Sequence, residues 1–295
     1  MTSVSIEPIT VADKDSGPYA VTSGPDGALW FTMVHSGRIG TLRSGRELET
    51  HQLTPECGPT IIAAGSDGAL WFTEYKAHRV GRITADGDVT EFSLPTAESG
   101  PFGIAPGPDG ALWFTETTAG KIGRITTAGE VTEYALPTAT AFPSAIVAGP
   151  GGKMWFTLNQ DNAIGSIDVD GVVEEFPLPT PAAGPVGIAD GEDEALWFVE
   201  IAAGAIGRMT KDGDITEFSL PDPEARPHAI IAGGDGALWF TEWGANRVGR
   251  ITYDGEISEY DLPGHHSEPH GITLGPDGAL WTAMETGALA RIEPR

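Results

Sequence analysis

The sequence has little cysteine, little positive charge and no long apolar run. Its one cysteine, Cys57, cannot form an internal disulfide, and the segment TPECGPT around it reads as a turn with an incidental thiol. Only 17 Lys and Arg stand against 42 Asp and Glu, and the net charge of -25 repels nucleic acids and anionic membranes. No stretch approaches the roughly 20 apolar residues that span a bilayer, and MTSVSIEPIT lacks the features of a signal peptide. We therefore expect a soluble, cytoplasmic protein without nucleic-acid or membrane partners.

A repeated unit organises the chain. The phrase DGALW and its variants place tryptophans 41 residues apart once and 42 residues apart five times, at positions 30, 71, 113, 155, 197, 239 and 281. Each unit reads as four short strands separated by Gly/Asp turns, in agreement with the 40 glycines and 23 prolines. A four-stranded repeat of this length is typical of a β-propeller blade, which buries its faces only against neighbouring blades. The sequence predicts an all-β, seven-bladed propeller in one domain, residues 1–295.

The two ends of the chain are predicted to complete one blade. The seventh unit stops at ARIEPR without a fourth strand, while SIEPITVADKDS at 5–16 aligns without gaps with DVTEFSLPTAES at 88–99. We expect the N-terminal segment to supply the outer strand of the last blade, which closes the ring and removes open sheet edges. Because closure leaves no edge strand to pair between copies, we expect a monomer.

Chemistry is expected where the units differ, since the shared residues build the scaffold. One variable position follows the proline that opens each unit, and its residues in chain order are Tyr19, Thr60, Phe102, Ser144, Val186, His228 and His270. A second lies three or four residues after the tryptophan, as in TEW at 241–243 and AME at 283–285. With a two-residue turn between the first two strands, His270 should pair with Glu285 and His228 with Trp243. The seven hairpin ends should ring one mouth of a central channel.

Acids and imidazoles concentrate in the last two units. There, Arg226 and Glu268 replace the glycine that opens other units, which indicates that their side chains are used. Glu268 and Glu285 offer hard oxygen ligands that suit Mg²⁺ or Ca²⁺. His270, between them, suits either a metal ligand or a general base. We expect these residues and His228 to form a functional site.

Other polar residues are assigned to the scaffold or to loops. The segment HHSEPH lacks the ligand spacing and the cysteine partner of a zinc site, so His265 and His266 are expected to be loop residues. Three glutamates of the repeated strand after the tryptophan are expected to be solvated or part of the scaffold: Glu74, Glu116 and Glu200. For Glu242, beside Trp243, both a scaffold role and a site role stay open.

The chain resembles the virginiamycin B lyases, also called streptogramin B lyases, over essentially its whole length. The resemblance rests on GPYA at 17–20, RPHAI at 226–230, TEWGANRVGRIT at 241–252, EPHGI at 268–272 and AME at 283–285. It implies an enzyme that opens type B streptogramin antibiotics, which are cyclic depsipeptides, by elimination at the lactone linkage, and so gives resistance. It further implies that Glu268 and Glu285 hold Mg²⁺, that His270 is the general base, and that His228 and Tyr19 contact the substrate.

The residue chemistry agrees with such a reaction. Removing the Cα proton of a threonyl residue leaves an enolate-like anion, which a divalent cation stabilises by several kcal/mol. A positioned base contributes roughly 10²- to 10⁴-fold, and the ester carboxylate then leaves from Cβ without a Ser or Cys nucleophile. Phe102, Trp243 and Tyr19 suit the apolar rim of a large cyclic ligand, or local packing.

Two other functions remain open at this point. A metal-dependent lactonase would use bound water to attack the ester carbonyl, by analogy with other propellers that bind divalent ions through carboxylates. A non-catalytic interaction platform would need no metal at the channel mouth and would not respond to a chelator. Hydrolysis adds the mass of water to the product, whereas elimination gives an isomer with a new dehydro-amino acid absorbance.

Overall fold

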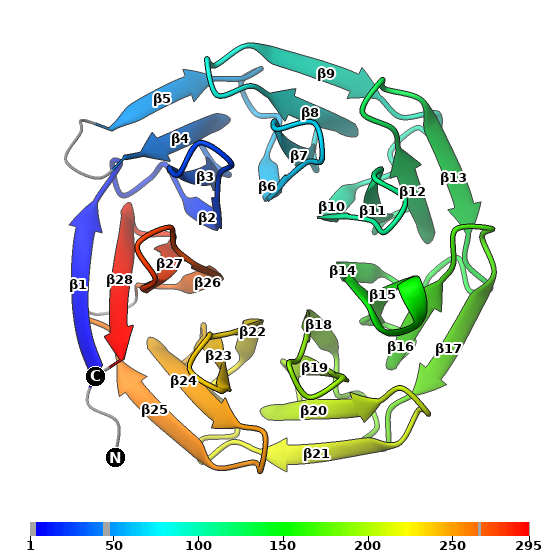
Figure 1. Ribbon diagram of the computed structural model, residues 1–295, viewed down its shortest axis with the longest axis vertical. Helices are drawn as coiled ribbons and strands as arrows, with labels where there is room; N and C mark the ends of the chain where they lie inside the picture. The colour runs from blue at the N-terminus through cyan, green and yellow to red at the C-terminus, as the bar shows by residue number, and fades with distance from the viewer. Residues whose placement is uncertain (1–3, 44–47, 265–266, 295) are drawn as a thin grey trace.

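The fold is a ring of seven four-stranded antiparallel sheets (Figure 1). This computed structural model describes residues 4–43, 48–264 and 267–294, so the expected loop residues His265 and His266 lie outside the described part. Within it the helical content is the short 3₁₀ turn η1 (Pro150–Gly152), and no helix is long and apolar enough to cross a membrane. The predicted all-β, seven-bladed propeller is confirmed.

The blades are numbered in chain order of their innermost strands, and each sheet runs from the channel outward. Blade 1 contains β2 (Pro18–Ser23), β3 (Leu29–Met33), β4 (Arg38–Leu42) and β5 (Glu49–Gln52). Blade 2 contains β6 (Pro59–Ala64), β7 (Leu70–Glu74), β8 (Arg79–Ile83) and β9 (Val89–Ser93). Blade 3 contains β10 (Pro101–Pro106), β11 (Leu112–Glu116), β12 (Lys121–Ile125) and β13 (Val131–Ala135). Blade 4 contains β14 (Pro143–Gly149), β15 (Lys153–Leu158), β16 (Ala163–Ile167) and β17 (Val173–Pro177).

The remaining blades follow the same plan, with one exception at the chain ends. Blade 5 contains β18 (Pro185–Asp190), β19 (Ala195–Glu200), β20 (Ala205–Thr210) and β21 (Ile215–Ser219). Blade 6 contains β22 (Pro227–Ala232), β23 (Ala237–Glu242), β24 (Arg247–Thr252) and β25 (Ile257–Asp261). Blade 7 contains β26 (Pro269–Leu274), β27 (Leu280–Met284), β28 (Ala288–Pro294) and, as its outer strand, β1 (Val4–Thr10).

Blade 7 closes the ring as predicted. Strand β1 pairs antiparallel with β28 along its whole length, from Val4 opposite Pro294 to Thr10 opposite Ala288. Figure 1 shows the blue N-terminal strand outside the red C-terminal one. The pairing covers the outer edge of β28. Because the chain continues from β1 into β2, it also ties blade 7, which carries His270, to blade 1.

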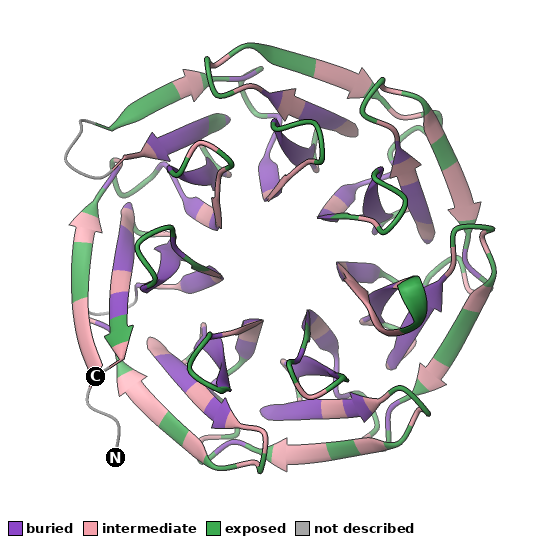
Figure 2. Cartoon of the chain, viewed as in Figure 1, coloured by how far each residue is buried: buried purple, intermediate pink, exposed green. Residues whose placement is uncertain are grey.

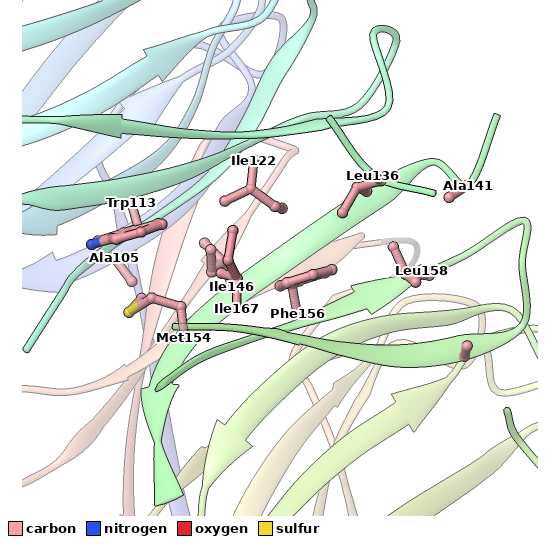
Figure 3. Close-up of a cluster of buried hydrophobic side chains, with 11 residues drawn as sticks. Ala105, Trp113, Ile122, Leu136, Ala141, Ile146, Met154, Phe156, Leu158 and Ile167 are labelled. Atoms are coloured by element: carbon pink, nitrogen blue, oxygen red, sulfur yellow. The ribbon is translucent and has the colours of Figure 1, made fainter. Parts of the chain in front are cut away.

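The core lies between neighbouring blades, because each blade buries its apolar faces on the next. Figure 2 shows that buried residues concentrate on the inner strands and exposed ones on the outer strands. In the cluster of Figure 3, Trp113 of blade 3 packs with Met154 and Phe156 of blade 4. The repeated glycine of the third strand is required by close approach, since a Cβ on Gly123 would lie 2.1 Å from the ring of Phe114.

The turn end of the first hairpin is held by the same hydrogen bonds in most blades. In blade 3, Asp109 accepts hydrogen bonds from the Trp113 indole (3.1 Å) and from Arg124 Nε (2.6 Å). Blade 4 differs, because Trp155 donates to the carbonyl oxygen of Pro150 at 3.0 Å. The aspartates that hold the tryptophan indole in the other six blades are Asp26, Asp67, Asp109, Asp193, Asp235 and Asp277.

The glutamates at the end of the second strand belong to the scaffold. All four have fully buried side chains and none lines the main cavity: Glu74, Glu116, Glu200 and Glu242. Burial, followed by the charge of Glu217, raises the pKa of Glu200 to about 8, and burial and Glu259 raise the pKa of Glu242 to about 8. The scaffold alternative therefore holds for Glu242 as well.

Candidate active site

The variable hairpin ends surround a largely apolar cavity of about 560 Å³ at one mouth of the ring. This volume lies in the range that accommodates a small-molecule ligand. Six of the seven residues that follow the opening prolines line the cavity: Tyr19, Thr60, Phe102, Ser144, Val186 and His228. The seventh, His270, is buried and contacts Tyr19 and Glu285, which both line the cavity.

The predicted cross-strand pairs at this mouth are wrong. In blade 7, Pro269 lies opposite Met284, and Glu285 donates its backbone N–H to the carbonyl oxygen of Glu268 at 3.2 Å. In the preceding blade Trp243 pairs in the same way with Arg226. The hairpin loop has three residues instead of two, and a bulge before Ile272 shifts the register again. The backbone partner of Glu285 is therefore Glu268, not His270.

Every residue before an opening proline adopts a left-handed backbone. The φ angles of these residues run from 50° to 68°, at Gly17, Gly58, Gly100, Phe142, Gly184, Arg226 and Glu268. Residues with a side chain are uncommon in this conformation. Arg226 and Glu268 therefore differ from the glycine that most other blades have here. Sequence reasoning missed the third departure, Phe142, although it stands in the same column of the repeat.

A pair of imidazoles holds the Glu285 carboxylate. The Nε2 atom of His270 lies 2.6 Å from Glu285 Oε2, and the Nε2 atom of His35 lies 2.5 Å from Oε1. The hydrogen bond from His270, aided by that from His35, holds the pKa of Glu285 below its usual range. His35 was not predicted, although the signal was present: it follows Val34, the variable residue of the neighbouring blade 1.

The other imidazole is neutral and in contact with a phenol. Burial, followed by the nearby His270, lowers the pKa of His228 to about 3, so its ring carries no charge at neutral pH. Its Nε2 atom lies 3.3 Å from the Tyr19 hydroxyl, whose pKa is raised by burial and by the charge of Glu285. The Tyr19 and His270 ring centroids are 4.4 Å apart, and those of His228 and His270 4.7 Å. Tyr19, His228, His270 and Glu285 thus form one cluster.

Blade 6 positions this cluster from the side. Thr241 Oγ1 donates to the carbonyl oxygen of His270 at 2.8 Å, which ties the backbone of blade 7 to blade 6. The Trp243 ring lies 6.4 Å from that of His270, and the Arg226 guanidinium lies 5.5 Å from the centroid of Trp243. Trp243 is therefore at the edge of the cluster beside His270, not opposite His228.

Glu268 faces a second, polar cavity beside the first. This cavity, of about 360 Å³, is lined by Glu224, Arg226, Trp243, Gly244, Asn246 and Glu268. Glu268 is joined to the main site through its backbone hydrogen bond with Glu285, which itself lines the larger cavity. The two carboxylates predicted as metal ligands therefore stem from paired backbone positions.

The donor set fits a hard cation. Across residues 4–43, 48–264 and 267–294, no group of three or more His, Cys, Asp or Glu side chains is placed to hold a metal. A pair of carboxylates is nevertheless the arrangement in which Mg²⁺ is ordinarily bound, because this ion keeps several of its waters. Glu268 and Glu285 supply two carboxylates of this chemistry from hydrogen-bonded backbone positions, whereas a zinc site would need more protein ligands.

Comparisons with known proteins agree on one family. The sequence profile described as the Virginiamycin B lyase family matches residues 4–292. A virginiamycin B lyase of Saccharopolyspora erythraea is 60% identical over 93 residues, which span 32% of this chain and 31% of that protein. The matched segment thus covers about a third of this curated relative.

Solved structures extend the similarity to nearly the whole length. A streptogramin B lyase structure superposes with a TM-score of 0.95 and 43% identity, over 99% of this chain and 98% of the other. A catalytically inactive histidine-to-alanine variant of virginiamycin B lyase from Staphylococcus aureus, with quinupristin, gives the same TM-score and identity over 98% and 99%. The chain belongs to the virginiamycin B lyase family.

Proposed function

We propose that the protein is a lyase that linearises type B streptogramins by metal-assisted β-elimination at the lactone ester. The observation that carries the proposal is the His270–Glu285 contact of 2.6 Å at the wall of a mostly apolar cavity. The walls suit a large apolar ring, and the contact places a titratable imidazole beside a carboxylate. Family membership supports the same reaction class.

The solved relative supports the type of substrate and the need for a histidine. The Staphylococcus aureus variant is catalytically inactive after one histidine-to-alanine change, and its structure was determined with quinupristin. Replacement of His270 is expected to have the same consequence in this chain. The substrate would then be a cyclic depsipeptide of this kind.

His270 would act as the general base through Nε2. This nitrogen faces the cavity-lining Glu285, whereas Nδ1 is buried and has no hydrogen-bond partner among the described residues. To accept a Cα proton, Nε2 must be the unprotonated nitrogen of the neutral ring, with the ring proton on Nδ1, and the Glu285 carboxylate must make room for the substrate beside it. The negative charge of Glu285 would then stabilise the imidazolium that forms.

Tyr19 and His228 would orient the substrate and exclude water. Both groups stay uncharged at neutral pH, since burial raises the pKa of Tyr19 and lowers that of His228. An uncharged hydroxyl and an uncharged imidazole can each donate a hydrogen bond to a peptide carbonyl without attacking the ester. Trp243, beside His270, would extend the apolar contact.

Glu268 and Glu285 would hold Mg²⁺, and the backbone hydrogen bond between these two residues supports this assignment. When bound, the ion would supply positive charge that stabilises the anion developing on the amide oxygen of the substrate. Departure of the ester carboxylate from Cβ completes the elimination without water as a reactant.

The test is product analysis. The purified protein is incubated with a type B streptogramin after EDTA treatment, with and without added Mg²⁺, and the product is followed by mass spectrometry and ultraviolet absorbance. We expect a linear product of unchanged mass with dehydro-amino acid absorbance, formed only with the metal. A product heavier by one water would show a lactonase instead, and absence of conversion with Mg²⁺ would refute both enzymes.

A further inference from the structure

Phe142 departs from the repeat in a way that the scaffold does not explain. It occupies the left-handed position before the opening proline, with φ of 56°, where four other blades have glycine. A bulky residue is rare in this conformation, which disfavours L side chains sterically. Retaining phenylalanine here therefore works against the stability of blade 4.

The side chain of Phe142 does not recover this cost by packing. It is 40% exposed, among the most exposed large apolar side chains of the described residues. The ring contacts at this mouth join Phe102 to Tyr19 and to Tyr75, and none formed by the described residues includes Phe142. Exposed apolar surface on strained backbone is typical of a ligand contact.

Phe142 lies on the cavity wall opposite the cluster of Tyr19, His228, His270 and Glu285. It lines the cavity of about 560 Å³ together with Ser144 and Ile146 of its own blade. Figure 1 shows β14, which follows Phe142, across the ring from β26, which carries His270. Only a ligand wide enough to span the channel can touch both walls at once.

We propose that Phe142 is a substrate-binding residue that packs against the apolar part of the cyclic depsipeptide furthest from the lactone bond. The inference rests on the proposed function, because the macrocycle is the ligand that spans the mouth. The other two residues that replace glycine, Arg226 and Glu268, flank the reactive cluster, and Phe142 is their counterpart on the opposite wall. The three departures from the repeat would hold the two sides of one ring-shaped ligand.

The experiment compares Phe142→Gly, Phe142→Tyr and the wild type in steady-state conversion of a type B streptogramin with Mg²⁺. We expect Phe142→Gly to raise KM roughly tenfold, since the buried area of one aromatic ring is lost, while kcat changes less than about twofold. Its thermal midpoint should rise, because glycine removes the left-handed strain. Phe142→Tyr keeps the ring, so its KM should stay within about threefold of the wild type.

Ala182→Gly is the matched control. Ala182 also has a left-handed backbone, with φ of 54°, but it is exposed and does not line the cavity. This variant should gain thermal stability and leave KM unchanged, which separates relief of strain from loss of the ring. An unchanged KM in Phe142→Gly, with the wild type converting the substrate, overturns the inference and leaves the proposed function intact. Absence of conversion by the wild type overturns both.

Discussion

The two ends of the first hairpin in each blade are built on opposite principles. At the turn end, six blades have an aspartate at the same position of the repeat, and it accepts a hydrogen bond from the tryptophan indole, as Asp109 does from Trp113. At the channel mouth, the residue after the opening proline is different in most blades, and two histidines stand next to each other on blades 6 and 7. Uniform contacts stabilise the ring, and we propose that the positions that vary between blades carry the chemistry.

The largest effect is expected from His270→Ala at the channel mouth. Loss of a positioned base should reduce turnover of a type B streptogramin by roughly 10²- to 10⁴-fold. The matched control is His78→Asn, because His78 lies outside the cavity and accepts the backbone N–H of Gly100 at 3.2 Å. Steady-state kinetics with circular dichroism spectra of both variants checks this prediction. Turnover near the wild-type rate by His270→Ala would remove the base assignment.

Glu285→Gln should have the next largest effect. The amide keeps the size of the side chain but removes the charge that Mg²⁺ and the imidazolium require, so activity should fall roughly 10²-fold. The apparent Mg²⁺ concentration for half-maximal activity should rise at the same time. Glu98→Gln, on an exposed residue away from the cavity, should change neither value. A normal Mg²⁺ titration for Glu285→Gln would contradict its role as a ligand.

The buried glutamates of the scaffold should make the free energy of unfolding depend on pH. The folded pKa of Glu200 is raised to about 8 from its ordinary 4.5, so the folded state binds the proton more tightly than the unfolded state. Its contribution to stability is present below pH 4.5 and is lost as pH rises through the folded pKa.

Glu200→Gln removes this dependence. Between pH 6 and pH 8 the free energy of unfolding of the variant, relative to the wild type, should rise by about 2 to 3 kcal/mol. Urea unfolding at the two pH values measures the difference. A difference that is constant with pH would show that Glu200 does not titrate in this range, and activity should be unaffected at either pH.

The smallest expected effect is at the turn end. Asp109→Ala leaves the buried Trp113 indole without its acceptor and releases Arg124, which should cost about 1 to 2 kcal/mol in the free energy of unfolding. Asp109→Asn retains the acceptor for Trp113 and should cost less. Chemical denaturation of the two variants, with kcat and KM as a check on the mouth, measures this. A change in KM would mean that the two hairpin ends are not independent.

The fold was predictable because the same pattern of strands and turns recurs in all seven units of the sequence. The tryptophan spacing and the match of residues 5–16 with 88–99 were sufficient to predict the blades and the closure through β1. The pairing of His270 with Glu285 was wrong as a backbone register, because neither the three-residue loop nor the bulge before Ile272 has a clear signature in one sequence. Their side chains meet nevertheless.

The residues that were missed lie next to the positions that were compared. His35 comes from blade 1, and its contact with Glu285 depends on how blades 1 and 7 meet after ring closure, which a unit-by-unit alignment does not contain. Phe142 was visible as a substitution of glycine, but its meaning depends on a left-handed φ and an exposed ring. The roles of all the predicted site residues stay predictions: Tyr19, His228, Trp243, Glu268, His270 and Glu285.

The most direct test measures both ends of the hairpin in two variants side by side. For His270→Ala and Asp109→Ala, kcat/KM for a type B streptogramin and the free energy of unfolding are determined under the same conditions. The account predicts that His270→Ala loses at least about 10²-fold in kcat/KM while it still folds and unfolds in one cooperative transition. Asp109→Ala should lose stability and keep kcat/KM. Equal loss of activity in both variants, or an active His270→Ala, would contradict the separation of scaffold from site.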